Sequence, residues 1–184
     1  MQYAESKGWR AHSFTLLLDG IEDIGDDLED ALAAAGCTDA LIGKRNGLVF
    51  LDFDREGDSA DKAILSAIRA VEGSKIGASV ARIEPGDHVT QAEIARRTGR
   101  PRETVRLWIE GQRGPAGFPR PYSGVGGKSL VWSWVDVARW LSTHDRLDNP
   151  GEVAFAAAVA NINGALDFRR NKGAYLEELR LLAG

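Results

Sequence analysis

The stretch from Thr90 to Glu110 constrains the fold of this chain more than any other, because it predicts two short helices joined by a tight turn. The predicted helices cover residues 91–98 and 102–110. Gly99 lies between them, where a turn can require the positive φ that glycine adopts cheaply. Pro101 fits the first turn of the second helix, where its missing amide hydrogen costs nothing. The segment therefore favours a crossed helix pair over a single long helix.

Side-chain spacing supports the same pair. Thr90 and Glu93 stand in the spacing of a capping box, in which each side chain satisfies the amide hydrogen of the other residue. A small residue is expected where the helices cross, and apolar residues follow at helical spacing on the inward side. The predicted motif core consists of Ile94, Ala95, Gly99, Val105 and Trp108. Together these residues predict a helix-turn-helix.

The residues downstream extend the motif. Gly117-Phe118-Pro119-x-Pro121 precedes a turn-rich stretch, 123–128, which is followed by Leu130-Val131-Trp132-Ser133-Trp134 and a predicted helix over 135–141. With the helix pair, this order resembles the winged helix-turn-helix of MerR-type regulators and of the related AlpA and excisionase proteins, over about 55 residues within 87–145. The resemblance implies a phenylalanine-proline pair, a two-stranded wing near 122–131 and a short helix ending in tryptophan-leucine.

The resemblance also implies binding to double-stranded DNA, because the N-terminal part of a recognition helix enters the major groove. Arginine can bind guanine O6 and N7 with two hydrogen bonds, worth roughly 1–3 kcal/mol of discrimination. Glu103 could accept from a cytosine amine or orient a neighbouring arginine. The candidate base contacts are Arg102, Glu103, Thr104 and Arg106. The candidate backbone contacts, which fix register without reading sequence, are Thr90, Arg96, Arg97, Arg100, Arg113 and Lys128.

The charge distribution favours a DNA contact in this part of the chain alone. The net charge of the whole chain is -4, which by itself argues against nucleic acid. Residues 1–86 contain 9 Lys/Arg and 16 Asp/Glu, whereas residues 87–146 contain 10 and 6. The central segment therefore has a net charge of +4 and can present the local positive field that phosphate binding requires.

The first 86 residues predict a separate α+β domain. Strands are expected over 12–19, 39–44, 48–54 and 76–83, and helices over 26–35 and 59–72. Asn46-Gly47 is a strong signal for a two-residue hairpin turn, and Gly36 suits the position after a helix end. The order strand, helix, strand, strand, helix, strand predicts a ferredoxin-like β-α-β-β-α-β sandwich. Such folds serve as ligand sensors, dimerisation modules and enzymes, so the fold does not name a function.

Candidate chemistry in the first domain is limited to Asp52 and Asp54, two carboxylates on one strand face that could hold a metal. Solvated acidic residues before a helix start are the better interpretation. No Ser-His-acid, Cys-His or phosphate-loop arrangement is found, because the glycine-rich run 124–129 lacks the spacing of a nucleotide loop. The single cysteine, Cys37, excludes an internal disulfide and a thiolate cluster. We expect no catalytic residue, no metal and no cofactor, and therefore no enzyme.

The last part of the chain, 147–184, predicts two apolar helices over 152–166 and 172–182, the first interrupted by Asn161 and Asn163 and weakened at Gly164. These helices pack either on the first domain or against a second copy of the chain. A homodimer reading two half-sites is the expected assembly. The four tryptophans of the central segment are expected in its core rather than as a stacking platform for single strands, with two of them on one strand face. They are Trp108, Trp132, Trp134 and Trp140.

The sequence thus predicts a ferredoxin-like domain (1–86), a winged helix-turn-helix (87–146) and a helical tail (147–184). We interpret the chain as a sequence-specific DNA-binding regulator of the bacterial cytoplasm, associated with the nucleoid. No secretory signal and no apolar run near 20 residues is present, so no membrane partner is expected. Alternatives are an excisionase-like architectural factor or self-repressing antitoxin, a ligand-sensing or metal-dependent enzymatic first domain, and a helix pair that contacts protein.

Overall fold

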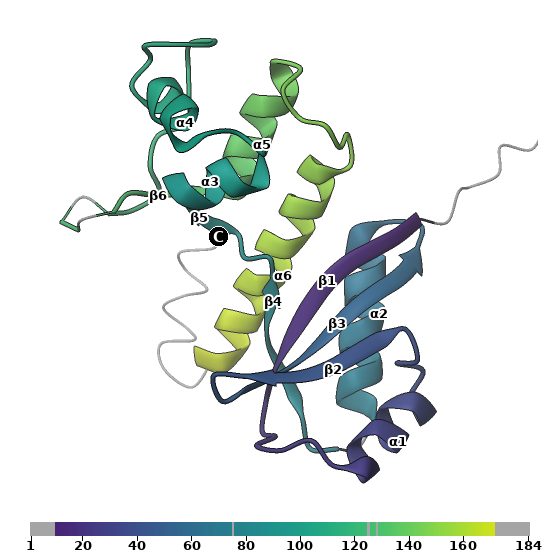
Figure 1. Cartoon of the computed structure of the whole chain (residues 1–184). Helices are drawn as coiled ribbons and strands as arrows, with labels where there is room; N and C mark the ends of the chain where they lie inside the picture. The colour runs from purple at the N-terminus through teal and green to yellow at the C-terminus, as the bar shows by residue number, and fades with distance from the viewer. Residues whose placement is uncertain (1–9, 75, 125, 128, 172–184) are drawn as a thin grey trace, which may run out of the picture. The chain divides into compact units, whose positions relative to one another are not determined.

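The computed structural model describes residues 10–74, 76–124, 126–127 and 129–171, and the fold is mixed α+β (Figure 1). The chain divides into two compact units, one containing residues 1–85 and 161–184 and the other residues 86–160. The division at 85/86 lies next to the expected boundary. Helix α6 (Glu152–Asn171) contributes residues to both units instead of forming a third. The helix expected over 172–182 lies outside the described residues.

The first unit is built on an antiparallel sheet with the strand order β2-β3-β1-β4. Two helices connect its strands, one between β1 and β2 and the other between β3 and β4. The expected order of strand, helix, strand, strand, helix and strand is therefore confirmed. The elements are β1 (Arg10–Asp19), α1 (Asp26–Ala34), β2 (Ala40–Arg45), β3 (Leu48–Gly57), α2 (Ala60–Gly73) and β4 (Ser79–Glu84).

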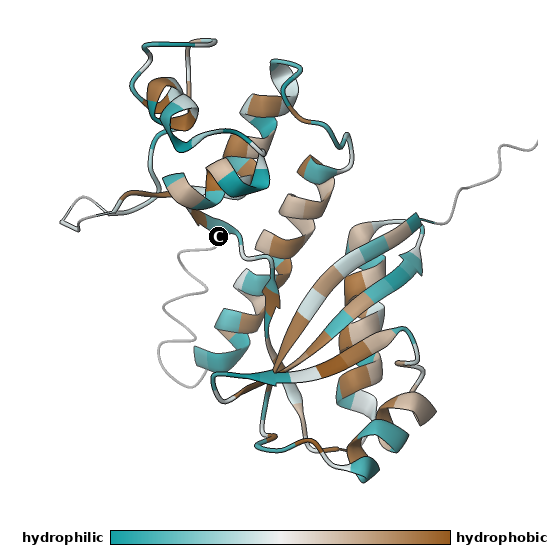
Figure 2. Ribbon diagram, in the orientation of Figure 1, coloured by the Kyte–Doolittle hydropathy of each residue, from teal (hydrophilic) through white to brown (hydrophobic). Residues whose placement is uncertain are grey.

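One face of this sheet is buried and the other is open, because apolar and polar side chains alternate along the central strands (Figure 2). Leu16 on β1 and Leu51 on β3 are completely or almost completely buried. Phe14 and Phe53 stack with their ring centroids 5.4 Å apart. Helix α2 covers this face with its apolar stripe, which includes Ile64, Ile68 and Val71. The open face carries the polar residues of the same strands.

A partly buried ion pair fixes the end of α1 to the sheet. The guanidinium of Arg55 donates to both carboxylate oxygens of Asp39, at 2.8 and 2.7 Å, and to the Gly36 carbonyl at 2.7 Å. These hydrogen bonds from Arg55 hold the pKa of Asp39 below its ordinary value. Gly36 has φ of +84°, as expected for the residue after a helix end. Arg55 therefore gives the Gly36 carbonyl, just after the end of α1, a hydrogen-bond partner on the sheet.

Helix α6 closes the outer edge of β4 with side chains. Asn163 is buried, and its amide accepts from the Ile83 N–H at 2.8 Å and donates to the Ile83 carbonyl at 3.1 Å. Arginines further along α6 donate to other carbonyls of β4. The expectation that Asn161 and Asn163 interrupt this helix is wrong, since α6 continues to Asn171. Asn163 is accommodated within α6 because its side-chain amide forms the two hydrogen bonds with Ile83 that a neighbouring strand would otherwise form.

The second unit packs three helices and the start of α6 around a small sheet. Strand β5 pairs antiparallel with β6, and Ser123 forms a single bridge to Val131. The elements are β5 (His88–Thr90), α3 (Gln91–Arg97), α4 (Arg102–Ile109), β6 (Val131–Ser133) and α5 (Trp134–Thr143). Across the part of the chain that the structure describes, no helix is both long and apolar enough to cross a membrane.

The four tryptophans of this unit lie in its core, as expected from their spacing. Trp108 and Trp140 have ring centroids 5.6 Å apart, and the indole N–H of Trp140 donates to the Ala116 carbonyl at 3.2 Å. The expectation that Trp132 and Trp134 share a strand face is wrong. Strand β6 ends at residue 133, which caps α5, so Trp134 begins the helix.

Candidate nucleic-acid interface

Helices α3 and α4 pack against each other through the residues of the predicted motif core. Ile94 and Val105 are fully buried, and Ala95 is nearly so. The hydroxyl of Thr90 accepts a hydrogen bond from the Glu93 amide at 3.3 Å, which is one half of the expected capping box. The Glu93 carboxylate accepts from arginine side chains instead of from the Thr90 amide. The crossed helix pair is thus present where the sequence placed it.

The turn between the two helices exposes its arginines. Gly99 has φ of +61°, and the Arg100 amide donates to the Ala95 carbonyl at 3.0 Å. Pro101 was expected in the first turn of α4, but it is the residue directly before the helix. Its carbonyl accepts hydrogen bonds from amides of that first turn. Arg100 and Arg102 are both exposed on either side of this proline.

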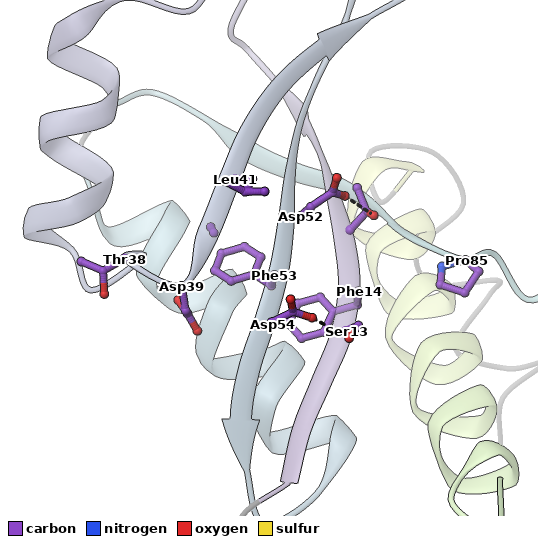
Figure 3. A pocket seen from close by; sticks show the side chains of 11 residues that line it. Ser13, Phe14, Thr38, Asp39, Leu41, Asp52, Phe53, Asp54 and Pro85 are labelled. Atoms are coloured by element: carbon purple, nitrogen blue, oxygen red, sulfur yellow. Dashed lines mark hydrogen bonds between the residues drawn. The ribbon is translucent and has the colours of Figure 1, made fainter.

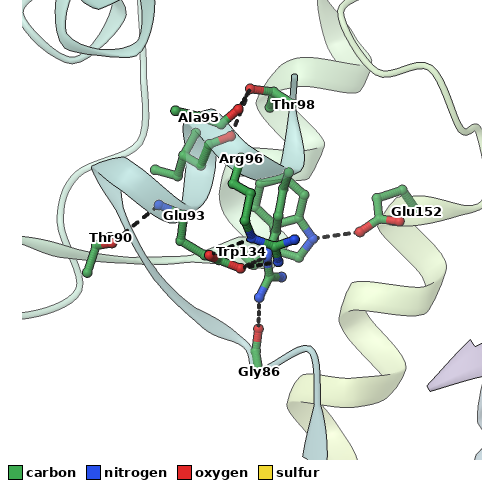
Figure 4. A network of polar contacts seen from close by, with 10 residues as sticks. Gly86, Thr90, Glu93, Ala95, Arg96, Thr98, Trp134 and Glu152 are labelled. Atoms are coloured by element: carbon green, nitrogen blue, oxygen red, sulfur yellow. Dashed lines mark hydrogen bonds and ion pairs between the residues drawn. The ribbon is translucent and has the colours of Figure 1, made fainter. Parts of the chain in front are cut away.

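A polar network around Glu93 holds α3 in place (Figure 4). Its carboxylate accepts from Arg96 at 3.0 and 2.7 Å and from Arg97 at 3.0 Å. Hydrogen bonds from Arg96 and then Arg97 lower the pKa of Glu93 to about 2. Arg97 also donates to the Gly86 carbonyl at 2.7 Å and lies 4.9 Å above the Trp134 ring. The Arg97 side chain is only 9% exposed, so its position suits a structural role better than the expected phosphate contact.

Arg106 is held between two carboxylates on the surface of α4. Its Nε and Nη2 donate to the two oxygens of Glu103 at 2.9 and 2.6 Å, and its Nη1 donates to Glu110. Glu103 first, and then Glu110, raise the pKa of Arg106. Glu103 was expected either to accept from a cytosine amine or to orient a neighbouring arginine. Its hydrogen bonds to Arg106 match the second role. The two glutamates therefore hold the Arg106 side chain in one orientation and offset its charge.

Four exposed arginines of the second unit have no carboxylate partner among the residues that the structure describes. They are Arg100, Arg102, Arg113 and Arg120, in the turn before α4, at its first residue and in the loops after it. All four are exposed. An unpaired guanidinium can exchange water for a phosphate oxygen or a base edge without breaking an ion pair. These four are therefore the strongest candidate contacts on this surface.

Sequence reasoning found three of these arginines and missed Arg120. A usable signal was present, because the chain contains no acidic residue between Glu110 and Asp136. Every cation in that interval lacks a sequence neighbour that could neutralise it. Lys128, which the resemblance placed at the tip of the wing, lies in the same interval but outside the described residues.

A groove of about 580 Å³ lies beside α4. Its lining includes Arg102, Arg106 and Trp132. The remaining lining residues come from the end of β5, the start of α3, the end of α4 and the segment before β6, and are Thr90, Gln91, Ala92, Ile109, Glu110, Ser129 and Leu130. Thr104, the other expected base contact, is half-buried and does not line this groove. The groove places two of the expected base-reading arginines on one surface.

A hairpin lies where the wing was expected, although its pairing is short. Ser123 and Val131 exchange backbone hydrogen bonds of 3.2 and 3.0 Å. Gly124 has φ of +109°, and a Cβ there would lie 2.5 Å from the Ser129 carbonyl oxygen. A residue with a side chain would therefore be strained at this position.

The acidic residues of the first unit form no comparable site. Asp52 accepts from the Thr15 hydroxyl at 2.5 Å and Asp54 accepts from the Ser13 hydroxyl at 2.6 Å, beside a hollow of about 340 Å³ (Figure 3). Over the described residues, no group of three or more His, Cys, Asp and Glu side chains could hold a metal ion. The two carboxylates are bound by neighbouring hydroxyls on the open face of the sheet.

Comparison with protein-family models, with curated proteins and with solved structures found no match to this chain. The functional argument therefore depends on the geometry of the site and on the motif resemblance.

Proposed function

We propose that this protein binds double-stranded DNA sequence-specifically through its second unit and acts as a transcriptional regulator. The observation that carries the proposal is the set of four unpaired, exposed arginines around α4, set in a chain that is otherwise acidic. Phosphate binding needs a local positive field, and sequence reading needs planar donors on an element that fits the major groove. Helix α4 with its arginines supplies both.

Both units are assigned to known architectures within this proposal. The first unit is taken as a ferredoxin-like sandwich, supported by its element order and its antiparallel strand order β2-β3-β1-β4. The second is taken as a winged helix-turn-helix similar to those of MerR-type regulators, supported by the crossed helices and the hairpin after α4. The acidic first unit would face away from the duplex, because like charges repel.

The proposed roles follow the pairing of each arginine. Arg102 reads a base, because it begins α4 and its guanidinium has no carboxylate partner among the described residues. Arg106 is a second base contact whose direction Glu103 fixes. The proposed backbone contacts are Thr90, Arg96, Arg100, Arg113 and Arg120, together with Lys128, which lies outside the described residues. Arg97 positions α3 and is left out of the contact set.

Selection of bound fragments from genomic DNA at two salt concentrations tests the proposal directly. On the selected sequence, Arg102→Ala is expected to lose roughly 1–3 kcal/mol of binding, with relaxed choice at one base pair. Arg100→Ala should weaken all sequences evenly and lower the salt slope by about 1. Arg139→Ala is the matched control, because Arg139 is an exposed arginine of α5 already paired with Asp136.

The decisive variant combines Arg102→Ala with Arg106→Ala. We expect it to lose sequence-selective binding while it retains weak binding to any duplex. Binding equal to that of the wild-type protein would refute the assignment of α4 as the reading element. A helix pair that contacts protein would give this result.

A further inference from the structure

The two edges of the sheet in the first unit are treated differently. The outer edge of β4 is closed by Asn163 on both backbone groups of Ile83, and by Arg169 and Arg170, which donate to the Val80 and Ala81 carbonyls at 2.7 and 2.9 Å. The opposite edge, along β2, has no such cover among the described residues. An edge strand with free amides and carbonyls is a template for another strand.

The hairpin fixes which groups of β2 face outward. Asn46 and Gly47 both have positive φ, so they form a two-residue turn, and Arg45 faces Leu48 across it. Backbone groups of every second residue from Arg45 therefore point to β3, in agreement with the Asp54 amide, which donates to the Asp39 carbonyl at 3.2 Å. The alternate residues point outward.

The outward-facing residues of β2 are Ala40, Ile42 and Lys44. The Ala40 amide is used in a turn to the Cys37 carbonyl at 3.3 Å. Within the described part of the chain, the other outward groups, namely the Ala40 carbonyl and the amides and carbonyls of Ile42 and Lys44, have no hydrogen-bond partner. A symmetric arrangement of donors and acceptors is thus centred on Ile42.

We infer that a second copy of this chain pairs with β2 antiparallel, about a twofold axis at Ile42, and joins the two sheets. In this register Ile42 meets Ile42 of the second copy through two backbone hydrogen bonds. Each Lys44 amide donates to the Ala40 carbonyl opposite. Four of the five outward groups that β2 leaves free, namely the Ala40 carbonyl, both groups of Ile42 and the Lys44 amide, are satisfied by the same four on the second copy, as an isologous interface requires.

Side chains on the open face of the sheet fit the same register. Leu41 is 76% exposed and would lie opposite Gly43 of the second copy. Gly43 has no side chain, and a Cβ there would overlap the ring of Phe50, which covers it. Leu41 would therefore meet the Phe50 ring across the interface and lose much of its exposed apolar surface.

Charge also selects a second copy over an unrelated strand. Arg45, which makes no ion pair within the described residues, would lie opposite Asp39 of the second copy. Lys44 is held by Asp23 at 2.6 Å and would face the small Ala40. No like charges oppose each other in this register. The strand also has no proline and no bulge against β3, the usual devices that block edge pairing.

Analytical ultracentrifugation of the full chain, without DNA, tests this inference independently of DNA binding. The wild-type chain should associate to a dimer, and Ile42→Pro should be monomeric. Proline removes the outward amide while leaving every bond to β3, so an edge strand tolerates it. Circular dichroism at equal concentration checks that the variant remains folded.

A second pair of variants keeps the test valid if the proline variant fails to fold. Leu41→Lys should abolish the dimer, whereas Leu48→Lys should not, because Leu48 is 51% exposed on the same face but lies on β3. A monomeric wild-type chain would refute the inference. So would a dimer that persists in both Ile42→Pro and Leu41→Lys, since the copies would then meet through another surface.

Discussion

The carboxylate of Glu93 is the centre of the network that holds α3, and its replacement gives a test of that network. We expect Glu93→Gln to destabilise the protein at neutral pH, because the nearly buried Arg97 loses the one carboxylate partner that it has among the described residues. The pKa of Glu93 falls from 4.5 to about 2 in the folded state, mainly through Arg96. At about 1.4 kcal/mol for each pKa unit, this lowering limits the stabilisation by the Glu93 carboxylate to about 3 kcal/mol.

The expected loss is smaller than that limit. The side chain of Arg96 is 68% exposed, so water and salt screen its share of the interaction. Allowing for this screening, we expect Glu93→Gln to lower the free energy of unfolding by about 1–2 kcal/mol. Glu103→Gln is the matched control, since Glu103 forms the same i,i+3 pair with arginine but on an exposed face, and no measurable change is expected.

The pH dependence fixes the sign of this effect. The folded-state pKa of Glu93 lies below its ordinary value, so the stabilisation is complete above about pH 4.5 and is lost as the pH falls toward 2. Urea unfolding of both proteins between pH 7 and pH 2 measures this difference. The gap between the wild type and Glu93→Gln should close at the acid end. A gap that stays constant across that range, or none at pH 7, would refute the role assigned to Glu93.

Three further predictions concern separate parts of the chain. Gly114→Ala should destabilise the second unit by about 1–3 kcal/mol in thermal unfolding, because Gly114 has φ of +85° and a Cβ would lie 2.8 Å from the Trp108 ring; an unchanged melting temperature would contradict this. Asn163→Leu should lower the free energy of unfolding in urea by about 2–4 kcal/mol, since two buried hydrogen bonds to β4 are lost, whereas the exposed Asn161→Leu should have little effect. Glu110→Gln should strengthen binding to non-specific duplex DNA more than to the selected site, measured by fluorescence anisotropy, because it removes a negative charge from the proposed interface; equal effects on both duplexes would argue against this role.

Local chemistry made much of the fold readable from the sequence. Asn46 and Gly47 have φ values of +54° and +80°, as a two-residue hairpin turn requires, and Gly99 has the positive φ that the helix pair needs. These features depend on residues adjacent in the chain, so the pattern contains all the information. The buried side chains of β3 also follow the alternation of its sequence, because a strand turns alternate residues to opposite faces.

The candidate site was readable only in part. The crossed helices, their core and the exposed Arg102 follow from spacing. Which arginines are free does not, because that depends on where each guanidinium meets a carboxylate or a carbonyl. Arg96 and Arg97 look equivalent in the sequence, but Arg97 is covered by Trp134 and held by the Gly86 carbonyl.

The sequence by itself determined the turns, the helix starts, the alternating faces and the concentration of positive charge between residues 87 and 146. The tertiary structure alone decided the long-range pairings. It placed Asn163 against Ile83, 80 positions away, and so turned an expected break in a helix into the closure of a sheet edge. It also placed Arg97 against the Trp134 ring and the Gly86 carbonyl, and so separated it from the exposed arginines. Local patterns report the preferences of neighbouring residues, whereas these partners are fixed only when the folded chain brings distant groups into contact.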